Sequence, residues 1–251
     1  MAVFITGASS GLGQALARHY ATQGHCLGLV ARRLDRLEAL ASQLPGQHHL
    51  YQADVQDRAA LHEAANDFLV RTGQVDIVIA NAGISAGTLT EELDDFGVFE
   101  EIFRTNVLAM VATFEPFLSS MKTHQRGTLV GIASVAGIRG LPGAGAYSAS
   151  KSAVITYCES LRLELAPHGV SVVTIAPGYV RSEMTAQNPY AMPFLLNADT
   201  FATRAAKAIH AKRRYAVIPW QMAIVSRIMR LLPAWLYDKL ATNAPRKPRR
   251  S

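Results

Sequence analysis

The amino-acid sequence predicts an α/β fold: a doubly wound parallel sheet of about seven strands, with helices on both faces, in a single domain. Two observations lead to this prediction. Short apolar runs alternate with longer amphipathic runs through most of the 251 residues. The short runs are apolar on both faces, which is typical of parallel strands that helices cover on both sides.

Each element is predicted from its own pattern: strands from β-branched apolar runs, and helices from apolar residues at helical spacing. We expect strands at residues 2–6, 25–30, 48–53, 75–80, 127–134, 170–176 and 215–219. We expect helices at residues 11–23, 34–44, 57–72, 93–122 and 147–169. In the first helix, Leu12, Leu16, His19 and Tyr20 form one packing face.

Two segments lie outside this alternation. Residues 179–201 are too long for a plain connection, so we expect them to form a lid over a binding site. Residues 220–251 predict an apolar helix interrupted at Pro233, followed by a basic tail. From Arg204 onward there are 12 Lys or Arg residues against one acidic residue. The tail is either a solvated end or a segment attracted to an anionic surface, such as a membrane or a nucleic acid.

The overall composition limits the class of protein. The hydrophobic fraction of 49% and the charged fraction of 18% are typical of a globular protein. Cys26 and Cys158 are far apart in the sequence, so we expect no disulfide framework, no metal site and a cytoplasmic location. No apolar run reaches the length of a membrane span. Base-stacking aromatic residues and a recognition motif are lacking, so we expect no nucleic-acid partner.

Three glycines mark the junction between the first strand and the first helix. Gly7 directly follows the strand, and Gly11 and Gly13 open the helix. A helix N-terminus without obstructing side chains offers its free N–H groups to a phosphate. This position in the first βα unit favours a dinucleotide site over an ordinary glycine-rich turn, although the order of the glycines differs from the common Gly-x-Gly-x-x-Gly pattern.

The end of the second strand indicates which dinucleotide is bound. Arg32 and Arg33 stand where a carboxylate would favour NAD, and Asp35 already belongs to the next helix. Two guanidinium groups can bind a 2′-phosphate, so we expect NADP(H) as the cofactor, and NAD(H) is less favoured. The alternative role for Arg32 and Arg33 is a solvated pair on the surface that binds no ligand. Asp54, after the third strand, is a candidate for the adenine amino group or a helix cap.

A serine, a tyrosine and a lysine indicate the chemistry. Ser134 ends the fifth strand, and Tyr147 and Lys151 are four residues apart on one expected helix. An ammonium beside a phenol favours the phenolate and lowers its pKa toward neutrality. Tyr147 is therefore a candidate general acid and base, and Ser134 a candidate donor to the same substrate oxygen.

Four motifs together resemble the short-chain dehydrogenase/reductase family: TGASSGLG, ANAG, Ser134 with YSASK, and PGYVRS. The match covers residues 2 to about 182, with Ala80 and Ser182 where the family often has Asn and Thr. The resemblance implies a Rossmann-type fold, a nicotinamide cofactor and a homodimer or homotetramer. It adds Asn106 to the catalytic set of Ser134, Tyr147 and Lys151. The cofactor-binding residues that it implies, with those inferred above, are Thr6, Gly7, Ser9, Ser10, Gly11, Leu12, Gly13, Arg32, Arg33, Asp54, Val55, Asn81, Ala82, Gly83, Tyr147, Lys151, Pro177, Gly178, Val180 and Ser182.

The resemblance also implies individual roles. Lys151 binds the nicotinamide ribose, Asn106 holds a water linked to Lys151, and Val180 offers its backbone to the carboxamide. Residues 1–219 then form the dinucleotide-binding and catalytic domain. We expect an oxidoreductase that interconverts a carbonyl and an alcohol; the alternative is a non-catalytic NADP(H)-binding regulator.

Apolar side chains around the expected site favour an apolar or lipid-like substrate, unless they only pack the lid on the domain. These side chains are Val135, Ile138, Leu141, Met184, Tyr190, Met192, Phe194, Leu195 and Leu196. No charged residue is placed to require an acidic substrate, with Arg139 and Arg181 as candidate exceptions. The last segment has apolar side chains for which three contacts are open: the domain itself, a second subunit, or a membrane interface that the tail also contacts. These side chains are Trp220, Ile224, Ile228, Leu231 and Leu232.

Overall fold

Seven parallel strands form one sheet in the computed structural model, which describes residues 1–186 and 188–249. The strand order is β3-β2-β1-β4-β5-β6-β7. The strands are β1 (Ala2–Thr6), β2 (Cys26–Ala31), β3 (His49–Gln52), β4 (Ile77–Ala80), β5 (Gly127–Ile132), β6 (Val170–Pro177) and β7 (Tyr215–Ile218). The order reverses between β1 and β4, and open α/β sheets bind ligands at the carboxyl ends of the strands beside such a reversal.

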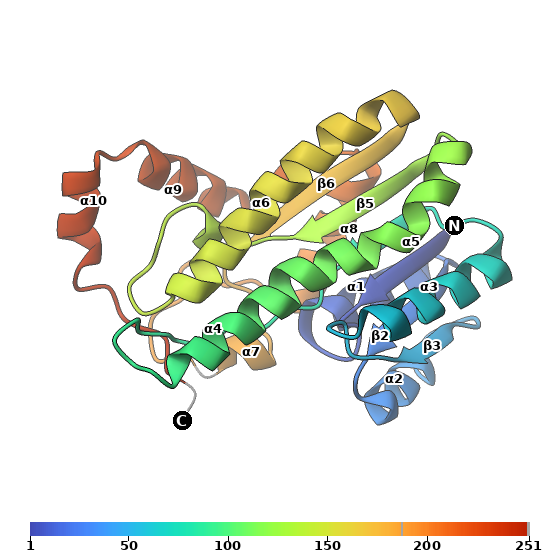
Figure 1. Cartoon of the computed structure of the whole chain (residues 1–251), viewed down its shortest axis with the longest axis horizontal. Helices are drawn as coiled ribbons and strands as arrows, with labels where there is room; N and C mark the ends of the chain where they lie inside the picture. Colours follow the sequence, from blue (N-terminus) through green and yellow to red (C-terminus); the bar gives the residue numbers. More distant parts are fainter. Residues whose placement is uncertain (187, 250–251) are drawn as a thin grey trace.

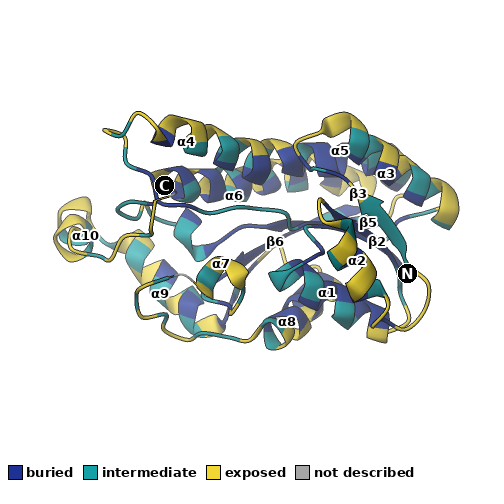
Figure 2. Cartoon of the chain, turned by 90° about the horizontal axis from the view of Figure 1, so that it is seen from below, coloured by how far each residue is buried: buried dark blue, intermediate teal, exposed yellow. Residues whose placement is uncertain are grey.

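Helices cover both faces of the sheet, which confirms the predicted fold class (Figures 1 and 2). One face carries α1 (Gly11–Thr22), α2 (Leu34–Ala41) and α8 (Ala198–His210). The other carries α3 (Arg58–Thr72), α5 (Ala109–Thr123) and α6 (Gly145–Leu165). The remaining helices are α4 (Asp95–Phe103), the short α7 (Glu183–Ala186), α9 (Trp220–Leu231) and α10 (Ala234–Ala241).

The structure changes the predicted long helix, the predicted lid and the candidate helix cap. The helix expected over residues 93–122 is α4 and α5, joined by a π-helical turn over Arg104–Leu108. The expected lid over residues 179–201 runs into α8, which begins at Ala198 and belongs to the body of the domain. The N-terminus of α3 is capped by Asp57, whose carboxylate accepts from two backbone N–H groups, so Asp54 is not the helix cap. Position 187 of the expected lid and residues 250–251 of the tail lie outside the described residues.

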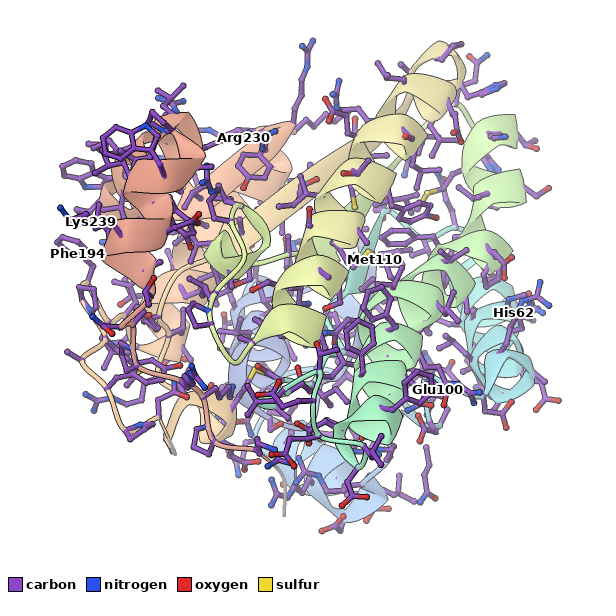
Figure 3. All side chains as sticks on the ribbon, turned by 60° about the vertical axis from the view of Figure 1, so that its left-hand side comes forward. His62, Glu100, Met110, Phe194, Arg230 and Lys239 are labelled. Atoms are coloured by element: carbon purple, nitrogen blue, oxygen red, sulfur yellow. The ribbon has the colours of Figure 1, made fainter. Side chains whose placement is uncertain are left out.

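The last helices form an arm that extends from the domain, and the chain then returns toward α4 (Figures 1 and 3). The predicted break at Pro233 separates α9 from α10. Trp220, Ile228 and Leu231 are 64%, 55% and 83% exposed, so of the three alternatives for these residues, packing on their own domain does not hold. Within the described residues no helix is long and apolar enough to cross a membrane.

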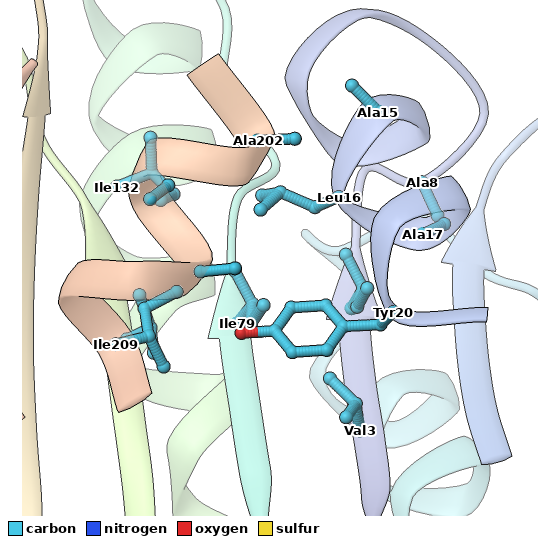
Figure 4. Packing of buried hydrophobic residues seen from close by; sticks show 14 of the residues in the cluster. Val3, Ala8, Ala15, Leu16, Ala17, Tyr20, Ile79, Ile132, Ala202 and Ile209 are labelled. Atoms are coloured by element: carbon cyan, nitrogen blue, oxygen red, sulfur yellow. The ribbon is translucent and has the colours of Figure 1, made fainter. Parts of the chain in front are cut away.

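The sheet buries an apolar layer on each face because successive side chains of its strands point to opposite sides. In β1, Val3 and Ile5 join the layer under α1 and α8, and Phe4 joins the layer under α3 and α5. Tyr20 of α1 is fully buried in the first layer, near Ile79 and Ile209 (Figure 4). These contacts hold the carboxyl ends of the strands in fixed positions relative to the helices.

Candidate active site

A cleft of about 370 Å³ lies at the carboxyl ends of the strands, where the sequence places its candidate residues. Of the predicted site residues, the cleft is lined by Gly7, Ser9, Ser10, Gly11, Leu12, Arg32, Arg33, Asp54, Val55, Asn81, Ala82, Gly83, Ser134, Tyr147, Lys151, Pro177, Gly178, Val180 and Ser182. Thr6, Gly13 and Asn106 are buried behind it. The structure therefore brings residues from seven separate stretches of the sequence to one place.

The glycine loop needs glycine for two different reasons. Gly7 and Gly11 have φ values of +67° and +55°, a backbone region that other residues rarely adopt. Gly13 has ordinary backbone angles, but a Cβ there would collide with the carbonyl oxygen of Gly7. The first turn of α1 can therefore approach the loop closely, and its N–H groups face the cleft without side chains in front of them.

Thr6 and Asn81 tie the glycine loop to the loop after β4. The Thr6 Oγ1 accepts from the backbone N–H groups of Asn81 at 3.2 Å and Ala82 at 3.3 Å. The Asn81 Nδ2 donates to the carbonyl oxygens of Thr6 at 3.0 Å and Gly7 at 3.2 Å. The Asn81 side chain thus holds the loop in shape.

Arginines gather at the outer end of the cleft, next to a carboxylate. An Arg33 nitrogen lies 3.5 Å from the Ser9 Oγ, and another lies 3.7 Å from the Glu183 carboxylate. Arg36 approaches Glu183 at 2.6 Å, and Arg32 lies 3.8 Å from the Asp54 carboxylate. The site already holds an anion between Arg33 and Arg36, so its chemistry suits a phosphate group.

Arg36 and Glu183 were not predicted as site residues. Arg36 lies three residues after Arg33, at the spacing that places two side chains on one side of a helix, so its signal was present in the sequence. Glu183 comes from α7, which is distant in the sequence, and no local pattern predicts its approach to the arginines.

Lys151 and Tyr147 meet on one face of α6, as their spacing predicts. The Lys151 Nζ lies 5.9 Å from the centre of the Tyr147 ring and donates to the carbonyl oxygen of Ile132 at 2.9 Å. Lys151 is 4% exposed, and this burial lowers its pKa to about 8. A buried ammonium is held here by a backbone carbonyl at the end of β5.

The expected lowering of the Tyr147 pKa is not found, because the structure gives the opposite direction. Burial raises the pKa of the Tyr147 phenol above its usual value, and a hydrogen bond with the Ser134 side chain lowers it in part. Desolvation opposes the charged phenolate and outweighs the effect of this hydrogen bond. Ser134 is itself fixed, because its Oγ accepts from the Ala136 N–H at 3.1 Å. Tyr147 therefore holds its proton at neutral pH.

Asn106 lies in the π-helical turn between α4 and α5 and is fully buried. Its Oδ1 accepts from the Ile84 N–H at 2.9 Å, and its Nδ2 donates to the Ile84 carbonyl at 3.0 Å and to the Ser150 Oγ at 2.9 Å. A Cβ on Gly83 would lie 3.0 Å from the Asn106 Oδ1 and 3.4 Å from the Lys151 Nζ. Asn106 and Lys151 thus converge on Gly83. Single π-helical turns within α-helices are frequent at functional sites.

The substrate side of the cleft differs from the prediction. Of the apolar residues proposed for the pocket, Met184 lines the cleft, whereas Ile138 lines a separate hollow near α9. Ile84, Glu101 and Thr105 line the cleft without having been predicted. No periodic pattern points to these residues, because three different elements place them: the loop after β4 holds Ile84, the end of α4 holds Glu101, and the π-helical turn holds Thr105.

A cation from the end of the chain also reaches this side. The Lys247 Nζ lies 5.9 Å from the centre of the Tyr147 ring and donates to the Ser85 Oγ at 2.8 Å. The interpretation of the tail as a solvated end is therefore wrong for Lys247. Arg139 and Arg181 were the only charged residues expected to favour an acidic substrate, and Lys247 adds a second ammonium beside Tyr147 that was not expected.

The sequence and the structure are both similar to those of known oxidoreductases. The family described as short chain dehydrogenase matches residues 1–192. An uncharacterized oxidoreductase of Myxococcus xanthus is 38% identical over 240 residues, which cover 94% of each chain. An alcohol dehydrogenase of Thermococcus sibiricus, solved with 5-hydroxy-NADP, is 29% identical with a TM-score of 0.75, covering 86% of this chain and 95% of that one.

A second solved structure is a short-chain dehydrogenase of Sphingobium yanoikuyae in complex with NADPH. It is 27% identical with a TM-score of 0.76, and the match covers 93% of this chain and 96% of that one. The chain belongs to the short-chain dehydrogenase family, and it is an oxidoreductase of that family.

Proposed function

We propose that this short-chain dehydrogenase uses NADP(H) to interconvert a ketone or aldehyde and an alcohol, with Tyr147 as the general acid and base. The observation that carries the proposal is the meeting of Ser134, Tyr147 and Lys151 at the cleft that the glycine loop also lines. Two solved relatives, described with 5-hydroxy-NADP and with NADPH, support the same cofactor class.

The residues around the cleft fit a phosphorylated dinucleotide. The first turn of α1 offers N–H groups to a pyrophosphate, and Gly7, Gly11 and Gly13 leave room for it. Arg32 and Arg33 line the cleft and would hold a 2′-phosphate, with Arg36 beside them in the neighbouring hollow, and Asp54 would accept from an adenine amino group. When bound, the cofactor supplies the hydride that a carbonyl carbon accepts.

Three side chains act on the substrate oxygen or support that action. The Ser134 hydroxyl donates to the carbonyl oxygen and polarises it. Tyr147, whose pKa is raised by burial, keeps its proton at neutral pH and delivers it to the same oxygen during reduction. The Lys151 ammonium favours the phenolate that remains and binds ribose hydroxyls of the cofactor. In the oxidative direction Tyr147 must lose its proton first, so oxidation requires higher pH than reduction.

Substitution of Tyr147 by Phe tests this assignment. We expect kcat for reduction to fall by about 10²–10⁴-fold, because the variant lacks the proton donor while Ser134 and Lys151 stay in place. The measurement is NADPH oxidation with a panel of apolar ketones and aldehydes, together with NADPH binding followed by fluorescence. Turnover that survives the substitution would remove Tyr147 as the acid. Binding of NADPH without turnover in the unmodified protein would favour the non-catalytic regulator.

The exposed apolar residues of α9 support association with a second surface. A second copy of the chain, giving a homodimer or homotetramer, accounts for exposed side chains such as Trp220 and Ile228. The alternative is peripheral contact with a membrane through α9 and the basic tail. Sedimentation velocity, and co-sedimentation with anionic liposomes, separate the two. A monomer that partitions to liposomes would overturn the oligomer and leave the membrane contact.

A further inference from the structure

The end of the chain lies against the loop that follows β4. The Gly87 N–H donates to the Pro248 carbonyl at 2.9 Å, and Gly87 forms an isolated parallel bridge with Arg249. A Cβ on Gly87 would collide with the carbonyl oxygen of Lys247. The loop therefore accommodates the tail, residues 246–249, only because glycine stands at this position.

Arg249 fastens the tail to a buried carboxylate. Its Nε lies 2.9 Å and 3.2 Å from the two carboxylate oxygens of Asp95, and its Nη2 lies 3.1 Å from Glu92. The Asp95 side chain is 4% exposed and also accepts from the Leu89 N–H at 2.7 Å. A buried carboxylate is costly unless a cation or several donors face it. The tail supplies that cation, so its contact with the loop is specific.

The tail also contacts the second loop beside Tyr147. A Cβ on Gly143 would lie 3.0 Å from the Arg246 Cβ, so the two backbones pass closely. The two loops are themselves joined, because the Thr88 N–H donates to the Gly143 carbonyl at 3.0 Å. The tail thus crosses the loops on either side of the proposed acid, and it places the Lys247 ammonium 5.9 Å from the Tyr147 ring.

We propose that residues 246–249 form a wall of the substrate site, with Arg249 as its positioning residue and Lys247 as a residue that determines specificity. Lys247 occupies the space beside Ser85 and Tyr147, so it excludes carbonyl compounds with bulk on this side. The inference rests on the proposed carbonyl–alcohol chemistry, and it adds a limit on substrate shape that residues 246–249 impose.

Two variants test the wall, with one matched control. Lys247→Ala removes the side chain that fills the space, and Arg249→Gln removes the contact with Asp95. The control is Lys239→Ala, which removes an exposed cation of α10. For each protein we compare kcat/KM for a bulky aryl ketone with kcat/KM for a small aliphatic ketone, both with NADPH. We expect the ratio to rise at least about tenfold in both test variants and to stay unchanged in the control.

Two further measurements distinguish a positioning role of Arg249 from a general disruption of the fold or of the cofactor site. NADPH affinity should stay within about twofold in every variant, because the tail contacts the substrate side of the site. Arg249→Lys should restore most of the unmodified ratio, since it keeps the cation. An unchanged ratio in Lys247→Ala overturns the proposal, as does a parallel loss of NADPH binding in Arg249→Gln.

Hydrogen exchange keeps this test independent of the proposed function. The Gly87 amide donates to the tail, so Arg249→Gln should speed its exchange at least about tenfold, whereas Lys239→Ala should not. Absence of turnover in the unmodified protein, with faster exchange in Arg249→Gln, would refute the carbonyl chemistry and uphold the docked tail. Turnover with unchanged exchange and an unchanged ratio would refute the wall alone.

Discussion

The two ends of the cleft are built in different ways. At the cofactor end, each loop directly follows its own strand, and Thr6 and Asn81 join the loops after the adjacent strands β1 and β4. At the substrate end, residues 84–95, the loop before Tyr147 and the tail meet from widely separated parts of the chain. The sheet therefore positions most of the cofactor end, and only its outer edge depends on Glu183 of α7, whereas the substrate end depends on segments that the sheet does not hold.

A change inside the glycine loop should break the cofactor end most severely. Gly13→Val introduces a side chain where even a Cβ collides with the Gly7 carbonyl oxygen. We expect a loss of at least about 3 kcal/mol in the free energy of unfolding and more than about hundredfold in NADPH affinity. Urea unfolding and fluorescence titration measure the two effects. The control is Gly97→Val in α4, where an added Cβ would have no atom within 4 Å apart from its chain neighbours and the backbone of its own helix. Equal losses in both variants would contradict the role of the close contact.

The next largest effect should come from the protonation of Lys151, and it should appear in the pH dependence of the free energy of unfolding rather than in cofactor binding. Burial lowers its pKa from the ordinary 10.5 to about 8. Below pH 8 the folded and unfolded chains both hold the proton, and the cost of burying the ammonium is fully present. Between pH 8 and 10.5 the folded chain releases the proton while the unfolded chain keeps it, so the Lys151 contribution to stability rises with pH.

Lys151→Met isolates this contribution, because tyrosines and cysteines titrate in the same range in both proteins. The free energy of unfolding of the unmodified protein minus that of the variant should increase by about 1.4 kcal/mol per pH unit between these pKa values. Urea unfolding at roughly pH 7 and pH 10 measures it. A difference that stays constant with pH would mean that Lys151 keeps its proton in the folded chain.

The smallest effects concern the arginines at the outer edge of the cofactor end, and they have opposite signs. Arg33→Ala should weaken NADPH about tenfold and leave NADH unchanged, since NADH lacks the 2′-phosphate. Glu183→Gln should tighten NADPH by about two- to threefold, because it removes a carboxylate that competes for Arg33 and Arg36. Titration with both dinucleotides measures the selectivity. Equal effects of Arg33→Ala on the two would rule out the 2′-phosphate assignment.

The sequence predicts the cofactor end well because each of its motifs lies within a few residues of a strand end. Periodicity locates the strands, and the parallel sheet brings their carboxyl ends together. Arg36 escaped prediction although its spacing from Arg33 was informative. Glu183 could not be predicted, because its position depends on how a loop folds back over the cleft.

The substrate end is poorly predicted for physical reasons. The tail has no periodic pattern, and its basic residues are typical of a solvated end. Its position depends on the pairing of Arg249 with Asp95, which are more than 150 residues apart in the sequence. The pKa of Tyr147 also could not be predicted, because it depends on burial, and spacing shows only which groups are neighbours.

The ion pairs of Glu183 have a consequence for how the cofactor responds to salt. A carboxylate already occupies the space between Arg33 and Arg36, so the arrival of a phosphate exchanges one anion for another. Added salt screens the old pair and the new pair together, and the two losses partly cancel. NADPH affinity should therefore fall less steeply with ionic strength than three arginines alone would suggest, and Glu183→Gln should restore the steeper dependence.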